Sequence, residues 1–185
     1  MVLTPATETE WLPELRTSPA NLREAASLLA RLASPAFLHT RVYPLVERTE
    51  SVESWYVVYR HDAPDGSCSL QVFVWPPGSR TCIHDHSSWG ALCCVAGSVL
   101  EERYERLDDA LRPEHARLKE IWRLEWGPED GISTVLPYDG GIHRIGNPTG
   151  EPAISVHLYG PRLGELDGRD YDPSRDYVCD RREER

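Results

Sequence analysis

The sequence predicts a mainly β protein, a barrel or jelly roll of short strands with helices packed on it. From about residue 53 to residue 159, short runs rich in β-branched and aromatic residues alternate with Gly and Pro turn signals, the pattern of a sheet-based barrel. Before them, the first 50 residues carry apolar side chains at helical spacing. Because the chain has 185 residues, 40% of them hydrophobic, we expect one domain with one sizeable core.

Residues 1–50 are predicted to be helical. Ser18 followed by Pro19 is a good N-cap and first-turn pair, and apolar residues then recur at positions 22, 25, 26, 29 and 32. We expect this apolar stripe to pack on the barrel. A second helical stretch from Phe37 to Glu47 contains Pro44, which is expected to kink or end it.

Residues 51–160 are predicted to form the barrel. Its first two strands are expected at 55–59 and 70–75, separated by a hairpin turn at Ala63-Pro-Asp-Gly66. Further strands are expected at 81–86, 91–96, 98–107, 116–122, 133–136, 142–145 and 153–159. The remaining residues, 161–185, are polar and rich in Arg and Asp, so we expect a solvated C-terminal tail.

Composition restricts the classes of partner. The formal net charge of -10 argues against nucleic acid, whose binding depends on clustered Lys and Arg. No run approaches the roughly 20 apolar residues of a membrane helix, and the N-terminus shows no basic segment followed by an apolar one. We therefore expect a cytoplasmic protein that binds small molecules and not membranes. The five cysteines form no Cys-x-x-Cys, which disfavours a disulfide framework.

A pair of histidines marks a candidate metal site. In an extended strand, His84 and His86 project to the same side while Asp85 points away. His143, on a strand brought alongside, would complete a face of three neutral imidazoles for a divalent transition metal.

The spacing around these histidines resembles the cupins. Gly78, His84, His86 and Gly97 reproduce the spacing of the first cupin motif. The second motif follows as Gly131, Pro137, Gly140, His143 and Asn147, with one extra residue between Pro137 and Gly140. Gly90 stands where cupins usually place a glutamate ligand, so a metal held here would keep three neutral ligands and favour an anionic substrate.

A second group of polar side chains lies near the end of the predicted barrel. Alternation places Ser155, His157 and Tyr159 on one face of a strand. Because buried polar groups need partners, these side chains either line a wet cavity or satisfy one another.

Together these motifs are similar to the thiol dioxygenases, the family of cysteine dioxygenase and 3-mercaptopropionate dioxygenase. The resemblance implies that His84, His86 and His143 bind Fe(II) and that Ser155, His157 and Tyr159 form the triad beside the substrate. Mammalian-type members crosslink this tyrosine to a cysteine shortly after the second histidine. Here that position falls on Gly90 or Ala91, so we predict an uncrosslinked tyrosine.

An arginine is expected to bind the substrate carboxylate, because a guanidinium makes paired charge-assisted hydrogen bonds. The resemblance offers Arg60, at the position used by mammalian-type enzymes, and Arg169, near the position used by mercaptopropionate-type enzymes. Arg162 is a weaker third candidate.

The sequence thus favours an iron-dependent thiol dioxygenase that uses O2 to convert a small thiol acid to its sulfinate. L-cysteine is the first expected substrate and 3-mercaptopropionate the second. Two other classes stay open: a zinc, nickel or manganese cupin acting as isomerase or hydrolase, and a binding cupin without catalysis. The sequence does not indicate an oligomeric state.

Overall fold

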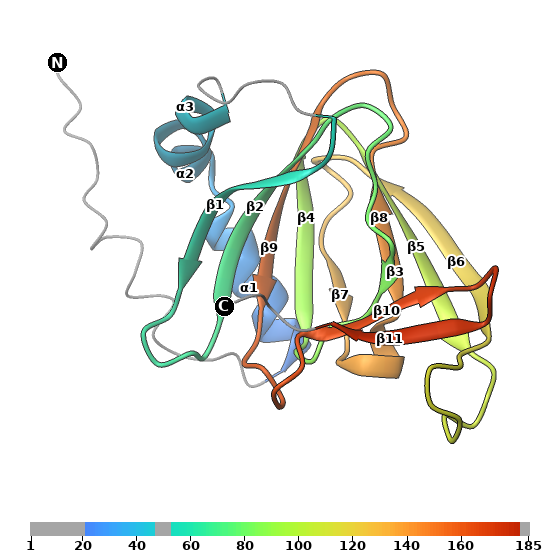
Figure 1. The fold of residues 1–185 in the computed structure, drawn as a ribbon. Coiled ribbons are helices and arrows are strands. Elements are labelled where there is room, and N and C mark those ends of the chain that lie inside the picture. Colours follow the sequence, from blue (N-terminus) through green and yellow to red (C-terminus); the bar gives the residue numbers. More distant parts are fainter. Residues whose placement is uncertain (1–20, 47–52, 182–185) are drawn as a thin grey trace, which may run out of the picture.

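The computed structural model describes residues 21–46 and 53–181. Two antiparallel sheets face each other and form a flattened barrel, with helices against the outside of one sheet (Figure 1). The prediction of a mainly β jelly-roll barrel with N-terminal helices is confirmed.

The first sheet has the strand order β1-β2-β9-β4-β7. Its strands are β1 (Tyr56–Asp62), β2 (Ser69–Trp75), β9 (Ala153–Tyr159), β4 (Gly90–Ala96) and β7 (Ser133–Val135). The expected hairpin joins β1 to β2, and β9 then inserts between β2 and β4. The last strand of the predicted barrel therefore lies in the middle of this sheet.

The second sheet has the order β11-β10-β3-β8-β5-β6. Its strands are β11 (Tyr177–Arg181), β10 (Gly168–Asp172), β3 (Ile83–His84), β8 (His143–Gly146), β5 (Val99–Arg106) and β6 (Leu118–Trp126). The short helix η4 (Tyr138–Gly141) leads into β8. Strand β3 is shorter than the expected 81–86, and β6 extends beyond the expected 116–122.

The first sheet is covered on both faces. Side chains alternate along its strands, so Val156 and Leu158 of β9 pack outward in one core cluster, whereas Phe73 and Trp75 of β2 pack inward in another. Because both faces are buried, β2 and β4 are nearly continuous runs of apolar residues. A sheet with one face in solvent would instead alternate apolar and polar residues.

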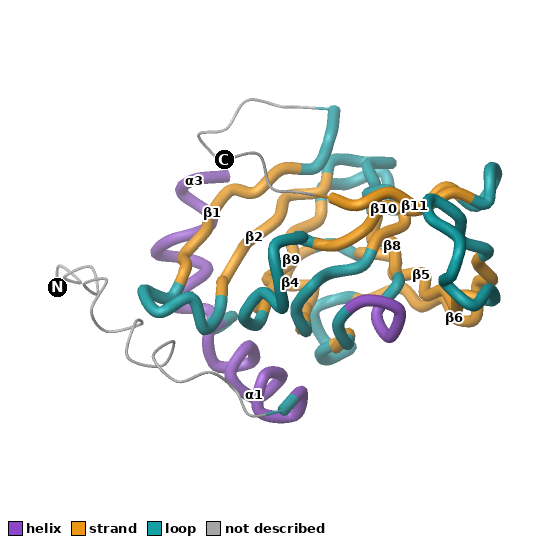
Figure 2. The backbone as a smooth tube through the Cα atoms, turned by 60° about the horizontal axis from the view of Figure 1, so that its bottom comes forward, coloured by secondary structure: helices purple, strands orange, loops and turns teal. Residues whose placement is uncertain are grey.

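Helix α1 (Leu22–Leu32) supplies the outer cover. Its buried Leu28 and Leu29 join the same cluster as Val156 and Leu158, and Figure 2 shows α1 on the side of the sheet away from β10 and β11. Asn21 caps the helix by accepting a hydrogen bond from the backbone N–H of Glu24 at 3.0 Å. The predicted cap at residues 18 and 19 lies outside the described residues.

The second helical stretch begins at Ser34, which caps α2 (Pro35–Phe37). A π-helical segment, η3 (Leu38–Val42), and α3 (Tyr43–Val46) follow. Pro44 lacks the N–H that would bond to the carbonyl of residue 40, and the wider π turn falls at that place. In the part of the chain that the structure describes, no helix has the length and apolar character to cross a bilayer.

The prediction of a solvated tail for residues 161–185 is wrong for most of its length. Strands β10 and β11 form a hairpin that extends the second sheet beside β3, seen in red in Figure 1. Buried Tyr171 and Val178 pack with Ile83, Tyr104 and Ile142. The many charged residues of this segment made it look solvated in the sequence, although Arg169 and Arg181 both form ion pairs in the fold.

Candidate metal centre

Three histidines converge between the sheets, as the sequence predicts. His84 ends β3 and pairs directly with His143, the first residue of β8, while His86 follows two positions after His84. The Nε2 atoms of His84 and His86 are 3.2 Å apart, and those of His86 and His143 are 3.3 Å apart. Among the described residues, these three form the group of ligand atoms close enough to hold one metal ion.

The outer nitrogens of two of these rings are already hydrogen-bonded. His84 Nδ1 lies 3.0 Å from the Cys82 carbonyl oxygen, and His143 Nδ1 lies 3.2 Å from Glu101 Oε1. Because both partners are acceptors, Nδ1 carries the proton in each ring and Nε2 presents its lone pair to the centre. Burial, together with the neighbouring imidazoles, holds the pKa of His84 and of His86 well below the usual range, so both rings are neutral.

The donor set fits a divalent transition metal. Two nitrogens bound to one ion at about 2.0–2.1 Å are roughly 2.8–3.0 Å apart in octahedral geometry and roughly 3.3–3.4 Å apart in tetrahedral geometry. The observed separations of 3.2 and 3.3 Å lie close to the tetrahedral value. Neutral imidazoles whose lone pairs face each other at this distance repel unless a cation lies between them. His84, His86 and His143 are therefore the residues that would hold the metal.

Glu101 is a residue of this centre that the sequence analysis missed. Its carboxylate is fully buried on β5 and accepts hydrogen bonds from His143 Nδ1, Arg103 Nε (3.1 Å), Ser133 Oγ (2.6 Å) and Trp126 Nε1 (3.2 Å). Burial would raise the pKa of the Glu101 carboxyl, but the hydrogen bond from His143 and the positive charge of Arg103 lower it to about 2. A negative charge thus stands directly behind one candidate ligand. Glu101, Glu102 and Arg103 are consecutive charged residues of the strand predicted for 98–107, so the sequence alone did not single out Glu101.

Asp85, between the two histidines, points away from the centre and fastens the C-terminal hairpin. Its Oδ1 accepts a bond from the Arg169 backbone N–H at 2.7 Å, and its Oδ2 accepts bonds from Arg169 Nε and the Tyr171 hydroxyl, each at 2.8 Å. The backbones approach so closely here that a Cβ on Gly168 would overlap the Asp85 carbonyl oxygen. Asp85 is fully buried, so this network holds the His84 to His86 segment against β10.

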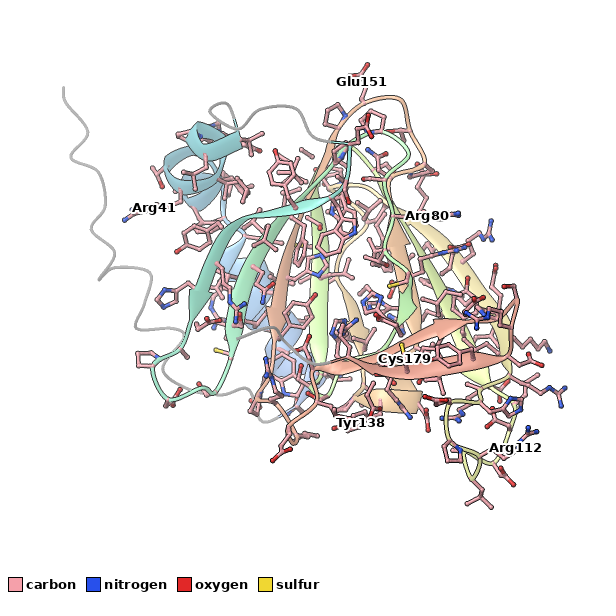
Figure 3. The ribbon with its side chains drawn as sticks, in the orientation of Figure 1. Arg41, Arg80, Arg112, Tyr138, Glu151 and Cys179 are labelled. Carbon is pink, nitrogen blue, oxygen red and sulfur yellow. The ribbon has the colours of Figure 1, made fainter. Side chains whose placement is uncertain are left out.

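Arg169 was predicted to bind the substrate carboxylate, and the structure places it on β10. Its guanidinium bonds to Asp85 and to Asp139 (2.7 Å) and lies over the rings of Tyr138 and Tyr171, with the Tyr138 centroid at 5.4 Å; Tyr138 is labelled in Figure 3. It does not line the cavity that contains the histidines, as far as the described residues show. Arg169 therefore holds the hairpin in place.

Ser155, His157 and Tyr159 lie on one face of β9, as alternation predicts, and form a chain of hydrogen bonds. Ser155 Oγ is 2.7 Å from His157 Nε2, and His157 Nδ1 is 3.0 Å from the Tyr159 hydroxyl. The Tyr159 ring contacts His86, with 4.9 Å between centroids. Burial lowers the pKa of His157 to about 3 and raises the pKa of the Tyr159 phenol, so both groups are neutral. This chain therefore ends beside the three histidines.

Gly90 lies directly opposite Tyr159 in the pairing of β4 with β9. A Cβ at this position would be 3.4 Å from Tyr159 Cδ1 and 3.0 Å from Val135 Cγ2, so the missing side chain gives the tyrosine ring its place. Cys93 and Cys94 are buried free cysteines paired with Val156 and Ser155. Neither cysteine is opposite Tyr159, and the absence of a crosslink stays a prediction.

A cavity of about 620 Å³ joins these groups. Its walls include the three histidines and the aromatic side chains of Trp55, Phe73 and Trp75. Of the predicted arginines, Arg60 and Arg162 line it. Arg60 Nε pairs with Asp62 at 3.0 Å, and both side chains are about half exposed.

Comparison with known proteins adds a family. The model of the family described as cysteine dioxygenase type I matches residues 20–172. Among solved structures, the protein TT1209 from Thermus thermophilus has 16% sequence identity and a TM-score of 0.43 over 63% of this chain and 94% of that chain. A cupin superfamily protein from Desulfitobacterium hafniense has 13% identity and a TM-score of 0.44, covering 65% and 91%. Oxalate oxidase in complex with glycolate has 15% identity and a TM-score of 0.46, covering 60% and 53%.

Proposed function

The chain belongs to the cysteine dioxygenase type I family, and on this premise we propose that it is an iron-dependent thiol dioxygenase. The proposed substrate is a small thiol that carries a carboxylate, with L-cysteine first. The thiol R–SH and O2 give the sulfinic acid R–SO2H, so both oxygen atoms end on sulfur and no external reductant is consumed.

One observation supports this function most strongly: the three Nε2 atoms and the Tyr159 hydroxyl lie at the same cavity. The metal would be held by His84, His86 and His143. Iron suits a site of imidazoles with open positions, and when bound it would supply the redox chemistry of oxygen transfer to sulfur.

The protein side chains then have distinct tasks. Tyr159, neutral because burial raises the pKa of its phenol, would donate a hydrogen bond to substrate or oxygen beside the histidines. Trp55, Phe73 and Trp75 form an aromatic wall that excludes water. The Arg60 guanidinium, which also lines the cavity, would bind the substrate carboxylate.

The charges at Arg60 and Asp62 favour L-cysteine over 3-mercaptopropionate. Both side chains line the cavity, and the pKa of Asp62 lies below its usual value: burial alone would raise it, but the hydrogen bond from Ser69 and the Arg60 guanidinium outweigh that effect. A positive and a negative group side by side match a zwitterion, which has a carboxylate and an ammonium group. 3-Mercaptopropionate offers only the carboxylate.

The test is oxygen uptake by the protein loaded with Fe(II). We expect one O2 consumed per L-cysteine, both atoms of labelled dioxygen in the sulfinate by mass spectrometry, and a higher kcat/KM for L-cysteine than for 3-mercaptopropionate. The zinc-loaded protein is the matched control and should consume none.

Two results would overturn the proposal. If no thiol stimulates oxygen uptake by the iron-loaded protein, the function is not thiol oxidation. If untagged protein purifies with zinc, nickel or manganese and iron cannot replace it, a cupin isomerase, hydrolase or binding protein is favoured instead.

A further inference from the structure

Trp75 makes a hydrogen bond that reaches the triad from its far end. Its indole Nε1 lies 2.8 Å from Ser155 Oγ, and both residues are almost completely buried, with 1% and 0% of their surface exposed. The indole N–H is a donor and has no acceptor role. Ser155 Oγ must therefore accept this bond.

The proton of the Ser155 hydroxyl then needs its own acceptor. Within the described part of the chain, the hydrogen-bond partners of Ser155 Oγ are Trp75 and His157 Nε2. Its neighbours on the two flanking strands, Phe73 and Cys94, belong to the apolar inner cluster. A buried hydroxyl proton without an acceptor is unfavourable. Ser155 therefore donates to His157 Nε2.

This direction fixes the tautomer of the imidazole. His157 is neutral, because burial strongly disfavours its charged form, so its single ring proton is on Nδ1 when Nε2 accepts. Nδ1 lies 3.0 Å from the Tyr159 oxygen and donates to it. The phenol proton is then not used in this bond and can turn toward the cavity.

We propose that Trp75 is a positioning residue that, through Ser155 and His157, makes Tyr159 a hydrogen-bond donor to the cavity. With the opposite direction of bonds, Tyr159 would donate to His157 and offer only lone pairs to a substrate. The indole N–H thus decides whether the centre has a donor or an acceptor opposite His86. The catalytic consequence rests on the proposed thiol oxidation, whereas the tautomer of His157 does not.

The direct test is the tautomer itself. In protein loaded with diamagnetic zinc and labelled with ¹⁵N, long-range ¹H–¹⁵N correlation spectra should show His157 with its proton on Nδ1. A proton on Nε2 overturns the proposal. Because this measurement uses the unaltered chain and no turnover, it distinguishes failure of the inference from failure of thiol oxidation, which the oxygen-uptake assay reports separately.

The second test is a double-mutant cycle. Trp75→Phe removes the N–H and keeps an aromatic ring, so the ¹⁵N signals of His157 should move toward a mixture of tautomers. In the iron-loaded protein kcat should fall about tenfold with little change in KM.

Tyr159→Phe should lower kcat at least as much, and adding Trp75→Phe to Tyr159→Phe should cause no further loss, because the proton that Trp75 directs is gone. If the two losses multiply, Trp75 acts through packing alone and the proposal fails. If Trp75→Phe does not fold, the tautomer of the unaltered protein still decides.

Discussion

Replacing Glu101 with glutamine tests whether its buried charge supports the metal centre. The two carboxylate oxygens receive four donors: Arg103 and His143 at Oε1, Ser133 and Trp126 at Oε2. A glutamine side chain has nearly the same shape but only one oxygen. Its NH2 group must face one of these two pairs of donors.

Either orientation of the amide has a cost. With the NH2 group toward His143, the imidazole can accept only if its proton moves to Nε2, the atom that faces the metal. With the NH2 group toward Trp126, an indole N–H loses its acceptor. Loss of one hydrogen bond to a charged group corresponds to about 1.5–3 kcal/mol, or roughly ten- to hundredfold in an equilibrium constant. Loss of such outer partners of metal-binding histidines typically weakens metal affinity about 10–100-fold.

We therefore expect Glu101→Gln to bind Zn(II) and Fe(II) about 10–100-fold more weakly, measured by competition with a chromophoric chelator. The matched control is Glu102→Gln, which removes the same charge from the next residue of β5. Glu102 is also buried, but its ion pairs are with Arg144 and Arg123 and it makes no hydrogen bond to the three histidines in the described structure. Equal affinity in Glu101→Gln and the unaltered protein, or an equal loss in both variants, would refute the reasoning.

Two further predictions concern Arg60, which lines the cavity, and Asp108, which follows β5. Arg60→Met should lower kcat/KM for L-cysteine about ten- to hundredfold, the value of a charge-assisted hydrogen bond, and should spare 2-aminoethanethiol, which lacks a carboxylate; an equal loss for both thiols would exclude carboxylate binding by Arg60. Asp108→Asn should destabilise the protein by about 1.5–3 kcal/mol at pH 7, because hydrogen bonds from Arg106 and from the backbone N–H groups of Arg117 and Ala110 hold the pKa of Asp108 below the ordinary 3.8. Since the folded-state pKa is lowered, this stabilisation is fully present above about pH 4 and is lost progressively as the pH falls from 3.8 toward the lower folded-state pKa. Urea unfolding should therefore show the full difference between the two proteins at about pH 7 and a smaller difference at about pH 3.

The alternation of side chains along a strand predicted which of the site residues share a face. His84 and His86 meet because two residues of an extended segment share a face, and the same rule aligned Ser155, His157 and Tyr159. The resemblance of the glycine and histidine spacing to the two cupin motifs implied that His143 lies near His84, and the structure pairs these two distant residues.

The missed features depend on partners that no local pattern identifies. Glu101 looked like an ordinary charge on a half-exposed strand until His143 and Trp126 were placed around it. Arg169 was predicted to bind the substrate because a guanidinium pairs well with a carboxylate. In the fold it pairs with the carboxylate of Asp85, which lies 84 positions earlier in the sequence. The hairpin of β10 and β11 was missed for a related reason. Arg169 pairs with Asp85 and Asp139 from distant parts of the sequence, and Arg181 pairs with Asp167 and Asp170 of the same segment.

The position of this hairpin has a consequence for the time at which the centre can form during synthesis. A ribosome that has just delivered Tyr159 has already made all three imidazoles and the whole triad, yet β10, which pairs with the strand of His84, does not exist. Tight metal binding by the growing polypeptide should therefore follow the synthesis of residues 168–181.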